Sequence, residues 1–413
     1  MDWTETNNYL KGIVNNLSNL NDPVRVAAFD LDDTIIHKPR GKSHNNKWQF
    51  FKNKEIITSK IKELVDDNYI IVIFTNQSGM NNGKNFNKCK WRQAMNDLMN
   101  FMMSSVKKYY FAVYVAKSYD LYRKPNIGLW EQMKNDLAEE FNLKKVRISA
   151  KSFFCGDAAG RTAPSKYRKI LYPKSLTGDF ADTDRKFALN IGILFLTPEQ
   201  FFEKDANEEE YELSGIDPVE LMNEAIDNNN DNDNDNNNNN NNNEYEFEPR
   251  NKEMIIMVGP PGSGKSEFVK KFILPHKYVH INQDTCRIKT KCLSLTETAL
   301  KKKKSIVIDN TNSNVLSRMD YTSLAKNHGY KHIRAIVMNT DIAIAKHLNN
   351  VRHVYSAGKQ SKINKIVYNI FKNNYVKPIK TEYFDKIETI DFVFDSEKLE
   401  DPKWKRIFLR YSE

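Results

Sequence analysis

The sequence predicts an α/β protein with two doubly wound domains, because apolar strands alternate with amphipathic helices in two stretches separated by a polar tract. In the first stretch, short apolar runs predict strands over residues 24–29, 69–74, 111–116 and 152–155. In the second, similar runs predict strands over residues 254–258, 278–281, 305–308 and 333–338. Such alternation builds parallel sheets, whose functional loops follow the carboxyl ends of the strands.

Helical periodicity fills the connections between these strands. Apolar residues recur near the helical period over residues 55–67, 91–106, 127–141, 295–303 and 341–349. We interpret residues 1–22 as a short polar helix or an N-terminal lead-in. The two stretches are not copies of one another, because their polar motifs differ.

The domain boundaries follow from composition. Residues 228–243 are only Asn and Asp, so this tract has no apolar surface to offset the entropy of an ordered chain. We therefore expect four segments: an N-terminal lead-in over 1–22, a first domain over 23–226, an acidic, disordered Asn/Asp-rich linker over 227–250 and a second domain over 251–413.

The bulk composition is that of a globular protein outside the membrane, with 40% hydrophobic and 28% charged residues. No apolar run approaches the ~20 residues that a membrane helix needs. Four scattered cysteines without metal-ligand spacing predict free thiols in a reducing, intracellular compartment.

The net charge of +10 understates the basic character of the two domains. Residues 203–248 hold 16 acidic residues and one lysine, so the rest of the chain carries +25. This excess favours polyanionic partners, nucleic acid above all. The alternative is solubility in a chain rich in Lys and Asn.

A phosphate-binding loop follows the first strand of the second domain. It matches the pattern G-x-x-x-x-G-K-[ST] at Gly259, Pro260, Pro261, Gly262, Ser263, Gly264, Lys265 and Ser266. Glycines in such a loop let consecutive backbone N–H groups face an anion at a helix N-terminus. Lys265 is expected to reach the β- and γ-phosphates and Ser266 to bind Mg²⁺. The alternative is a Gly/Pro-rich turn, but the strand-loop-helix context favours ATP binding.

Three charged residues of the second domain are further candidates. Asp284 follows a predicted strand and could accept the proton of an attacking hydroxyl, although it could equally be a turn or helix-cap acid. Asp309 ends another strand, where it could support Mg²⁺. Arg352 could close over the phosphates as a lid or lie on a solvated helix face. The lysine run over 301–304 could be a localisation signal, but we favour a solvated or DNA-facing edge.

Two aspartates end the first predicted strand of the first domain. Asp30 and Asp32 share one face of the strand, so one carboxylate could attack phosphorus while the other handles the leaving-group proton. Thr75 could donate to a phosphoryl oxygen, Lys124 could supply a cation and Asp157 a metal ligand. A solvated turn is the alternative for the D-x-D pair alone.

These motifs resemble those of two related families. D-x-D-x-T, a strand-end Thr, a Lys and a later acid are typical of haloacid-dehalogenase-like phosphatases. The segments FDLDDTII, VIFTNQSGM, LYRKPNIGLW and FFCGDAAGR further resemble the phosphatase domain of bifunctional polynucleotide kinase 3′-phosphatases. The segments VGPPGSGKS, YVHINQDT and HLNNVR resemble the kinase domain of the same family.

The resemblance implies a role for each candidate. Asp30 would be the nucleophile and Asp32 the general acid/base; both would contribute to the metal site with Asp157. Thr75 and Lys124 would hold the phosphate. A further acid of the phosphatase site would come from the segment DFADTDR, and this acid could be Asp179, Asp182 or Asp184.

In the kinase domain, the resemblance implies that Asp284 is the general base and Arg352 a lid arginine, with ATP as phosphate donor and Mg²⁺ as cofactor of both reactions. We therefore expect a monomeric, nuclear DNA end-healing enzyme that removes 3′-phosphate and phosphorylates 5′-hydroxyl ends. An RNA end-healing enzyme, a small-molecule kinase fused to a nucleotide phosphatase and a binding scaffold with inactive sites are the alternatives. About 22 residues before the first domain cannot form a forkhead-associated domain, so recruitment by repair scaffolds stays open.

Overall fold

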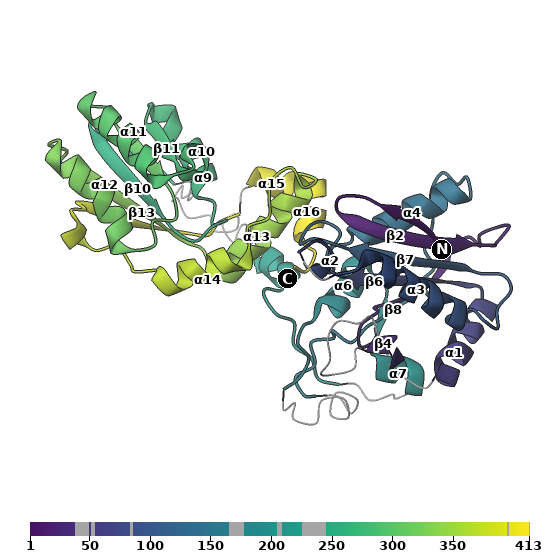
Figure 1. Ribbon diagram of the computed structural model, residues 1–413. Helices are drawn as coiled ribbons and strands as arrows, with labels where there is room; N and C mark the ends of the chain where they lie inside the picture. Colours follow the sequence, from purple (N-terminus) through teal and green to yellow (C-terminus); the bar gives the residue numbers. More distant parts are fainter. Residues whose placement is uncertain are drawn as a thin grey trace, which may run out of the picture. The chain divides into compact units, whose positions relative to one another are not determined.

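The computed structural model describes residues 1–37, 49–50, 54–82, 86–164, 177–204, 209–224, 245–394 and 396–412. The chain forms two compact units (Figure 1). The first unit comprises Met1–Asp217 and Arg410–Glu413, and the second comprises Pro218–Leu409. Among the described residues, no helix has the length and apolar character needed to cross a membrane.

The first unit is built on a seven-stranded sheet in the order β1-β2-β7-β6-β3-β8-β9. The strands are β1 (Asp2–Glu5), β2 (Tyr9–Asn15), β3 (Arg25–Phe29), β6 (Tyr69–Asn76), β7 (Tyr110–Ala116), β8 (Phe153–Cys155) and β9 (Leu194–Leu196). From β7 to β9 all pairs are parallel, and β2 is antiparallel to both β7 and β1. A separate two-stranded sheet pairs β4 (Ile36–His37) with β5 (Gln49–Phe50).

The N-terminal segment differs from its prediction as a polar helix or lead-in. Residues 1–22 contain β1 and β2, and β2 pairs with β7 along its whole length. Leu10 of β2 packs into the apolar layer on one face of the sheet and Tyr9 into the layer on the other. Because both faces are covered, the strand lacks the alternation of apolar and polar residues that would have revealed it.

Helices cover both faces of the first sheet, as the doubly wound arrangement requires. The helices are α1 (Lys54–Asp66), α2 (Gly79–Asn82), α3 (Lys88–Met102), α4 (Gly128–Glu140), α6 (Thr183–Ile191) and α7 (Pro198–Glu203). One core layer includes Ile61 of α1, Leu98 of α3 and Phe202 of α7. The opposite layer includes Met133 of α4 and Phe187 of α6. The strand ends are therefore held rigidly between two packed layers.

The second unit contains a parallel five-stranded sheet in the order β11-β12-β10-β13-β14. The strands are β10 (Glu253–Val258), β11 (Val279–Asn282), β12 (Ile306–Asp309), β13 (His332–Asn339) and β14 (Lys386–Asp391). The α-helices are α9 (Lys265–Phe268), α10 (Gln283–Cys286), α11 (Lys289–Lys301), α12 (Val315–Asn327), α13 (Ile342–Tyr355), α14 (Lys365–Asn374), α15 (Ser396–Glu400) and α16 (Pro402–Phe408). Leu300 and Tyr321 pack on one face of the sheet, and Phe268 and Ile273 pack on the other.

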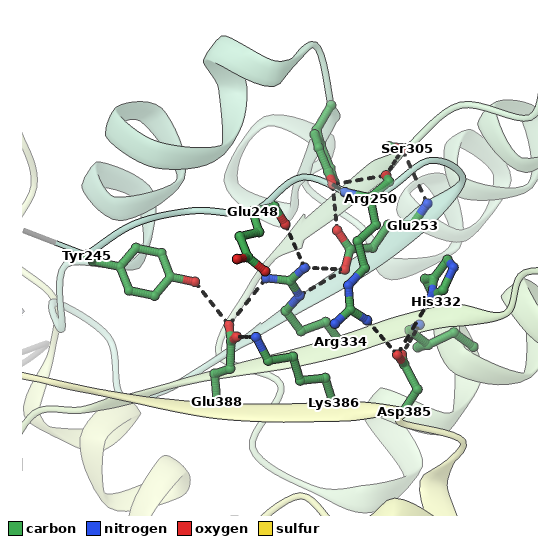
Figure 2. Close-up of polar contacts among 12 residues, drawn as sticks. Tyr245, Glu248, Arg250, Glu253, Ser305, His332, Arg334, Asp385, Lys386 and Glu388 are labelled. Carbon is green, nitrogen blue, oxygen red and sulfur yellow. Dashed lines mark hydrogen bonds and ion pairs between the residues drawn. The ribbon is translucent and has the colours of Figure 1, made fainter.

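The second unit begins earlier in the chain than expected. Most of the predicted linker lies outside the described residues, but Tyr245 and Phe247 pack against the core of this unit. Arg334 donates to the Glu248 carbonyl oxygen at 2.9 Å and to the Glu253 carboxylate at 2.8 Å (Figure 2). The two aromatic residues supply the apolar surface that the Asn/Asp tract lacks, which explains why ordered structure begins before residue 251.

The end of the chain also differs from the expected boundary. Residues 410–412 belong to the first unit, not the second. The Tyr411 N–H donates to the Asn190 side chain at 2.7 Å, and the Asn190 amide donates to the Tyr411 carbonyl oxygen at 2.9 Å. The Lys186 ammonium donates to the Ser412 carbonyl oxygen at 3.0 Å. These contacts join residues more than 200 positions apart, so local sequence patterns carry no sign of them.

Candidate active sites

The candidate residues of the first unit meet at the carboxyl edge of its sheet. Asp30 directly follows β3, Thr75 lies near the end of β6 and Asp157 follows β8. These three strands are neighbours and parallel, so their carboxyl ends share one edge. The Asp30 N–H donates to the Cys155 carbonyl oxygen at 2.8 Å, which continues the pairing of β3 and β8 into the site.

Three carboxylates and one ammonium form the centre of this site. One carboxylate oxygen from each of Asp30, Asp157 and Asp184 lies within 4.8 Å of the others. The Lys124 ammonium donates to Asp30 at 2.5 Å and to Asp184 at 2.7 Å, with its side chain 2% exposed. The structure therefore brings together Asp30, Lys124 and Asp157, as expected from the sequence.

The electrostatics of the cluster show an excess of negative charge. Burial raises the pKa of Asp30 to about 7; Lys124 opposes this rise, while Asp184 and Asp32 add to it. Burial, followed by the charges of Asp184 and Asp30, also raises the pKa of Asp157 well above its usual range. Burial alone would lower the pKa of Lys124, but the neighbouring carboxylates raise it, so this lysine stays charged.

These residues fit a divalent cation. Carboxylate oxygens are the ligands that Mg²⁺ prefers, and the three carboxylates repel one another with only one ammonium among them. A bound cation would remove that repulsion. Asp30, Asp157 and Asp184 are therefore the residues of the described chain that could hold it.

Asp184 is the acid of the DFADTDR segment that lies in the cluster. It sits in the first turn of α6, and its carboxylate also accepts the Ala158 N–H at 3.1 Å. Asp179 instead bonds Arg161 at 2.8 Å, and Asp182 forms an ion pair with Lys186 at 2.8 Å. The sequence alone does not show which of the three acids belongs to the site, because no local pattern sets which side chain faces Lys124.

Asp32 and Thr75 are linked by a residue that the sequence analysis left without a role. The Gln77 side-chain amide donates to Asp32 at 2.5 Å and to the Thr75 hydroxyl at 3.0 Å. Asp32, expected among the metal ligands, lies outside the group of three carboxylates found in the described residues. Its carboxylate is held near Thr75 by the amide that both residues share.

Asn76 is a second residue that was missed. Its side chain accepts the Lys124 N–H at 3.0 Å and donates to the Lys124 carbonyl oxygen at 3.2 Å. It thereby fixes the backbone of a lysine 48 positions away. Only the position of Asn76 at a strand end could have indicated this role.

In the second unit, the phosphate-binding loop joins β10 to α9 at the carboxyl edge of the sheet. Gly259, Gly262 and Gly264 have φ values of 154°, 78° and 86°. Ala345 of α13 closes over the loop, because a Cβ at Gly262 would lie 2.7 Å from its carbonyl oxygen. A side chain at this position would therefore meet both backbone strain and a steric clash.

Lys265 is buried within the loop that it follows. Its ammonium donates to the carbonyl oxygens of Gly259 at 3.0 Å and Pro260 at 2.6 Å. Burial lowers its pKa to about 8, and the charges of Asp309 and Asp284 oppose that shift. The ammonium is thus held in the loop and within electrostatic reach of both acids.

Asp309 ends β12 beside the loop. Its carboxylate accepts the Asn282 amide at 2.9 Å and lies 3.0 Å from His280 Nε2. Burial would raise the pKa of Asp309, but hydrogen bonds from His280, Ser266 and Asn282 lower it. Asp309 is therefore an ionised partner of the Ser266 hydroxyl, as a residue supporting a magnesium site would be.

Asp284 and Arg352 lie at the exposed rim. Asp284 is in α10, where its N–H is capped by the Asn282 side chain at 2.7 Å. Arg352 of α13 donates to Asn349 at 3.2 Å, and Asn349 Cβ would lie 3.5 Å from a Cβ on Gly262. Asn349 thus connects Arg352 to the phosphate-binding loop. Sequence reasoning gave Asn349 no role.

The lysine run over 301–304 begins at the last residue of α11 and precedes the amino end of β12. Asp309 lies at the opposite, carboxyl end of the same strand. At ~3.3 Å per residue, the strand separates the run from the phosphate-binding loop by about 10 Å. The run is solvent-exposed and stands apart from this site.

Comparison with known proteins finds a family match in each half of the chain. Residues 25–202 match the family described as polynucleotide kinase 3 phosphatase, and residues 254–378 match an AAA domain family. A bifunctional polynucleotide phosphatase/kinase of Schizosaccharomyces pombe is 30% identical over 89% of this chain and 80% of its own length. A protein of Acanthamoeba polyphaga mimivirus, provisionally named a bifunctional polynucleotide phosphatase/kinase, is 56% identical over 100% of this chain and 95% of its own length. The chain belongs to the bifunctional polynucleotide phosphatase/kinase family.

Membership of the bifunctional polynucleotide phosphatase/kinase family confirms the family and the fold class predicted from the motifs. It also accounts for the order of the two units, a phosphatase domain followed by a kinase domain that uses ATP. A polynucleotide 3′-phosphatase of Arabidopsis thaliana is 32% identical over 44% of this chain and 24% of its own length. That likeness is confined to less than half of the present chain.

Proposed function

We propose that this enzyme heals DNA strand ends by removing 3′-phosphate in the first unit and phosphorylating 5′-hydroxyl in the second, with Mg²⁺ in both sites. The observation that carries the proposal is the presence in one chain of two separately built clusters whose residue types suit phosphate chemistry. One is the buried cluster of three carboxylates and Lys124, and the other is the glycine loop that encloses Lys265.

In the phosphatase reaction, a carboxylate oxygen of Asp30 attacks phosphorus, and the bond from phosphorus to the 3′-oxygen breaks. Asp32 gives a proton to the leaving 3′-oxygen and then takes one from the water that hydrolyses the aspartyl-phosphate. The position of Asp32, held beside Thr75 by Gln77, supports this role. Thr75 and Lys124 would bind the phosphoryl oxygens.

Asp30, Asp157 and Asp184 would hold Mg²⁺, with Lys124 as the fixed cation beside it. When bound, the ion would neutralise the charge between the carboxylates and the phosphate. The protein residues supply the geometry, because the two strand ends and the first turn of α6 place the three carboxylates.

In the kinase reaction, Asp284 accepts the proton of the 5′-hydroxyl as its oxygen attacks the γ-phosphorus of ATP, and ADP leaves. Lys265 and Arg352 would stabilise the transferred charge. Ser266 would bind Mg²⁺, and its hydrogen bond to Asp309 supports that assignment. The exposure of Asp284 is consistent with access for a strand end.

A polynucleotide substrate is supported by surfaces beyond the reacting groups. Residues 354–381 of the kinase unit contain six lysines and no acid, and the charge outside residues 203–248 is +25. Phe180 in the phosphatase unit is 96% exposed, although it follows Asp179, whose side chain is 1% exposed and bonded to Arg161. Such an aromatic ring can stack on a nucleobase. Free nucleosides or mononucleotides would not need these features.

The test uses a nicked duplex that carries 5′-hydroxyl and 3′-phosphate ends, incubated with protein, ATP and Mg²⁺. We expect both ends to be converted; Asp30→Asn should abolish only dephosphorylation and Lys265→Ala only phosphorylation. Parallel RNA strands and mononucleotides decide the substrate class. Equal or faster turnover of RNA would refute the DNA assignment, and equal turnover of mononucleotides would refute a polynucleotide substrate. Nuclear localisation stays a prediction from the family resemblance.

A further inference from the structure

The loop that carries Asp157 is held by an extensive set of hydrogen bonds. The Ala158 N–H donates to Asp184, and the Ala159 and Arg161 N–H groups both donate to Asp179 Oδ2 at 3.1 Å. The Gly160 N–H donates to the Ala181 carbonyl oxygen at 3.1 Å. The backbone donors from 158 to 161 are thus bonded to the segment that contains Asp179 and Asp184.

One buried arginine connects this loop to the rest of the unit. The Arg161 guanidinium donates from Nε to Asp179 at 2.8 Å and from Nη2 to the Asp157 carbonyl oxygen at 3.3 Å. Its Nη1 donates to Glu199 and to Glu209, each at 3.0 Å. Glu199 lies in α7 and Glu209 in the segment after it. Arg161 therefore fixes the Asp157 loop to three other segments.

Arg161 is not placed to contact a substrate. Its side chain is 4% exposed, and each guanidinium nitrogen already donates to the protein. Burial would lower the pKa of Arg161, but Asp179, Glu199 and Glu209 raise it. The arginine is therefore a permanent cation whose three guanidinium nitrogens make four hydrogen bonds to protein acceptors.

We propose that Arg161, acting through Asp179, is a positioning residue that keeps the Asp157 loop at the spacing required for metal binding with Asp30 and Asp184. This inference rests on the proposed function only in its use of a divalent cation. Residues that are hydrogen-bonded to the ligands of a metal site orient those ligands. Losing such a residue typically costs about 10- to 100-fold in metal affinity or activity.

The decisive variant is Arg161→Lys, which keeps the positive charge but cannot bond Asp179, Glu199 and the Asp157 carbonyl oxygen together. We expect kcat for 3′-dephosphorylation to fall about 10- to 100-fold. The Mg²⁺ concentration for half-maximal activity should rise, with KM for the oligonucleotide at saturating Mg²⁺ within about twofold of wild type. Asp179→Asn should act in the same direction. The 5′-kinase activity of the same preparation should not change.

A readout independent of turnover is Mn²⁺ binding, followed by electron paramagnetic resonance without ATP or substrate. Arg161→Lys should weaken the Mn²⁺ site that Asp184→Asn removes. The matched control is Arg147→Gln, which breaks another arginine-aspartate pair of this unit at 2.7 Å but on a surface where the arginine is 67% exposed. It should alter neither Mn²⁺ binding nor kcat.

The inference is overturned if Arg161→Lys and Asp179→Asn fold and bind Mn²⁺ as wild type does, with kcat and half-maximal Mg²⁺ within about twofold. It is also overturned if KM alone rises, since that would place Arg161 in substrate binding. Should Arg161→Lys fail to fold, Glu209→Gln removes a single, 32% exposed partner. Glu209→Gln must then weaken Mn²⁺ binding, although by less than is expected for Arg161→Lys. Absence of 3′-phosphatase activity in the wild type would refute the proposed function and leave the Mn²⁺ comparison valid.

Discussion

A single methyl group at Gly156 should disable the phosphatase site. A Cβ built on Gly156 would lie 2.4 Å from Asp184 Oδ2 and 2.6 Å from its Cγ. Ordinary contact begins near 3.4 Å, so the carboxylate must retreat by about 1 Å. Asp184 is 2% exposed and bonded to Lys124 and the Ala158 N–H, so it cannot move without losing those bonds. A displacement of about 1 Å can cost roughly 10²-fold in rate.

The assay is the initial rate of phosphate release from a 3′-phosphorylated oligonucleotide at saturating Mg²⁺. We expect Gly156→Ala to lower kcat about 10²-fold and to leave 5′-kinase activity intact. Gly79→Ala is the matched control, because nothing lies within 4 Å of a Cβ there. If Gly156→Ala retained more than about a third of the wild-type rate, the carboxylate would not need its observed position and the assignment of Asp184 to the site would be refuted.

Three further predictions concern the kinase and the acid stability of the chain. Lys265→Ala should lower 5′-phosphorylation about 10²- to 10³-fold and spare dephosphorylation; loss of both activities in a folded protein would contradict the independence of the sites. Asp284→Asn should lower kinase kcat about 10²- to 10⁴-fold, and a pH-rate profile identical to wild type would exclude it as the base. Hydrogen bonds from Lys117 and then Lys88 lower the pKa of Glu5 to about 2, against the effect of burial. The bonds of ionised Glu5 to these lysines should therefore stabilise the fold by about 2 kcal/mol, after discounting for partial exposure. This stabilisation is present above pH 4.5 and is lost as the pH falls toward 2. In urea unfolding, Glu5→Gln should remove this loss of stability at low pH.

The parts of the fold that the sequence predicts are those encoded by contiguous residues. The phosphate-binding loop, from Gly259 to Ser266, lies within one strand-turn-helix, and its glycines occur where the backbone has positive φ values. The strand ends that carry Asp30 and Asp157 are likewise preceded by apolar runs that can be recognised locally. The family resemblance supplied roles that local patterns could not.

What the sequence could not supply depends on contacts between distant positions. Asp184 is distinguished from Asp179 and Asp182 by its bond to Lys124, 60 residues earlier. Gln77 acquires its role by bonding Asp32, 45 residues earlier. Neither residue differs in type from many surface residues, so only the sheet order and the start of α6 show which way each side chain faces.

Charge balance in the phosphatase site predicts that phosphate and a divalent cation bind together. With one oxygen of each carboxylate within 4.8 Å of the others, each ionised pair repels by about 3 kcal/mol at an effective dielectric constant of 20. When all three carboxylates are ionised, Lys124 offsets only one of their three negative charges, and a phosphate dianion would then meet a site that is already negative. Because 1.4 kcal/mol is a factor of ten, even one uncompensated pair corresponds to about 100-fold in affinity. Inorganic phosphate should therefore bind Asp30→Asn at least about 100-fold more tightly with Mg²⁺ than in EDTA, measured by calorimetry, because that substitution prevents turnover but leaves two carboxylates. Equal affinity in EDTA would mean that Lys124 and Thr75 alone hold the phosphate.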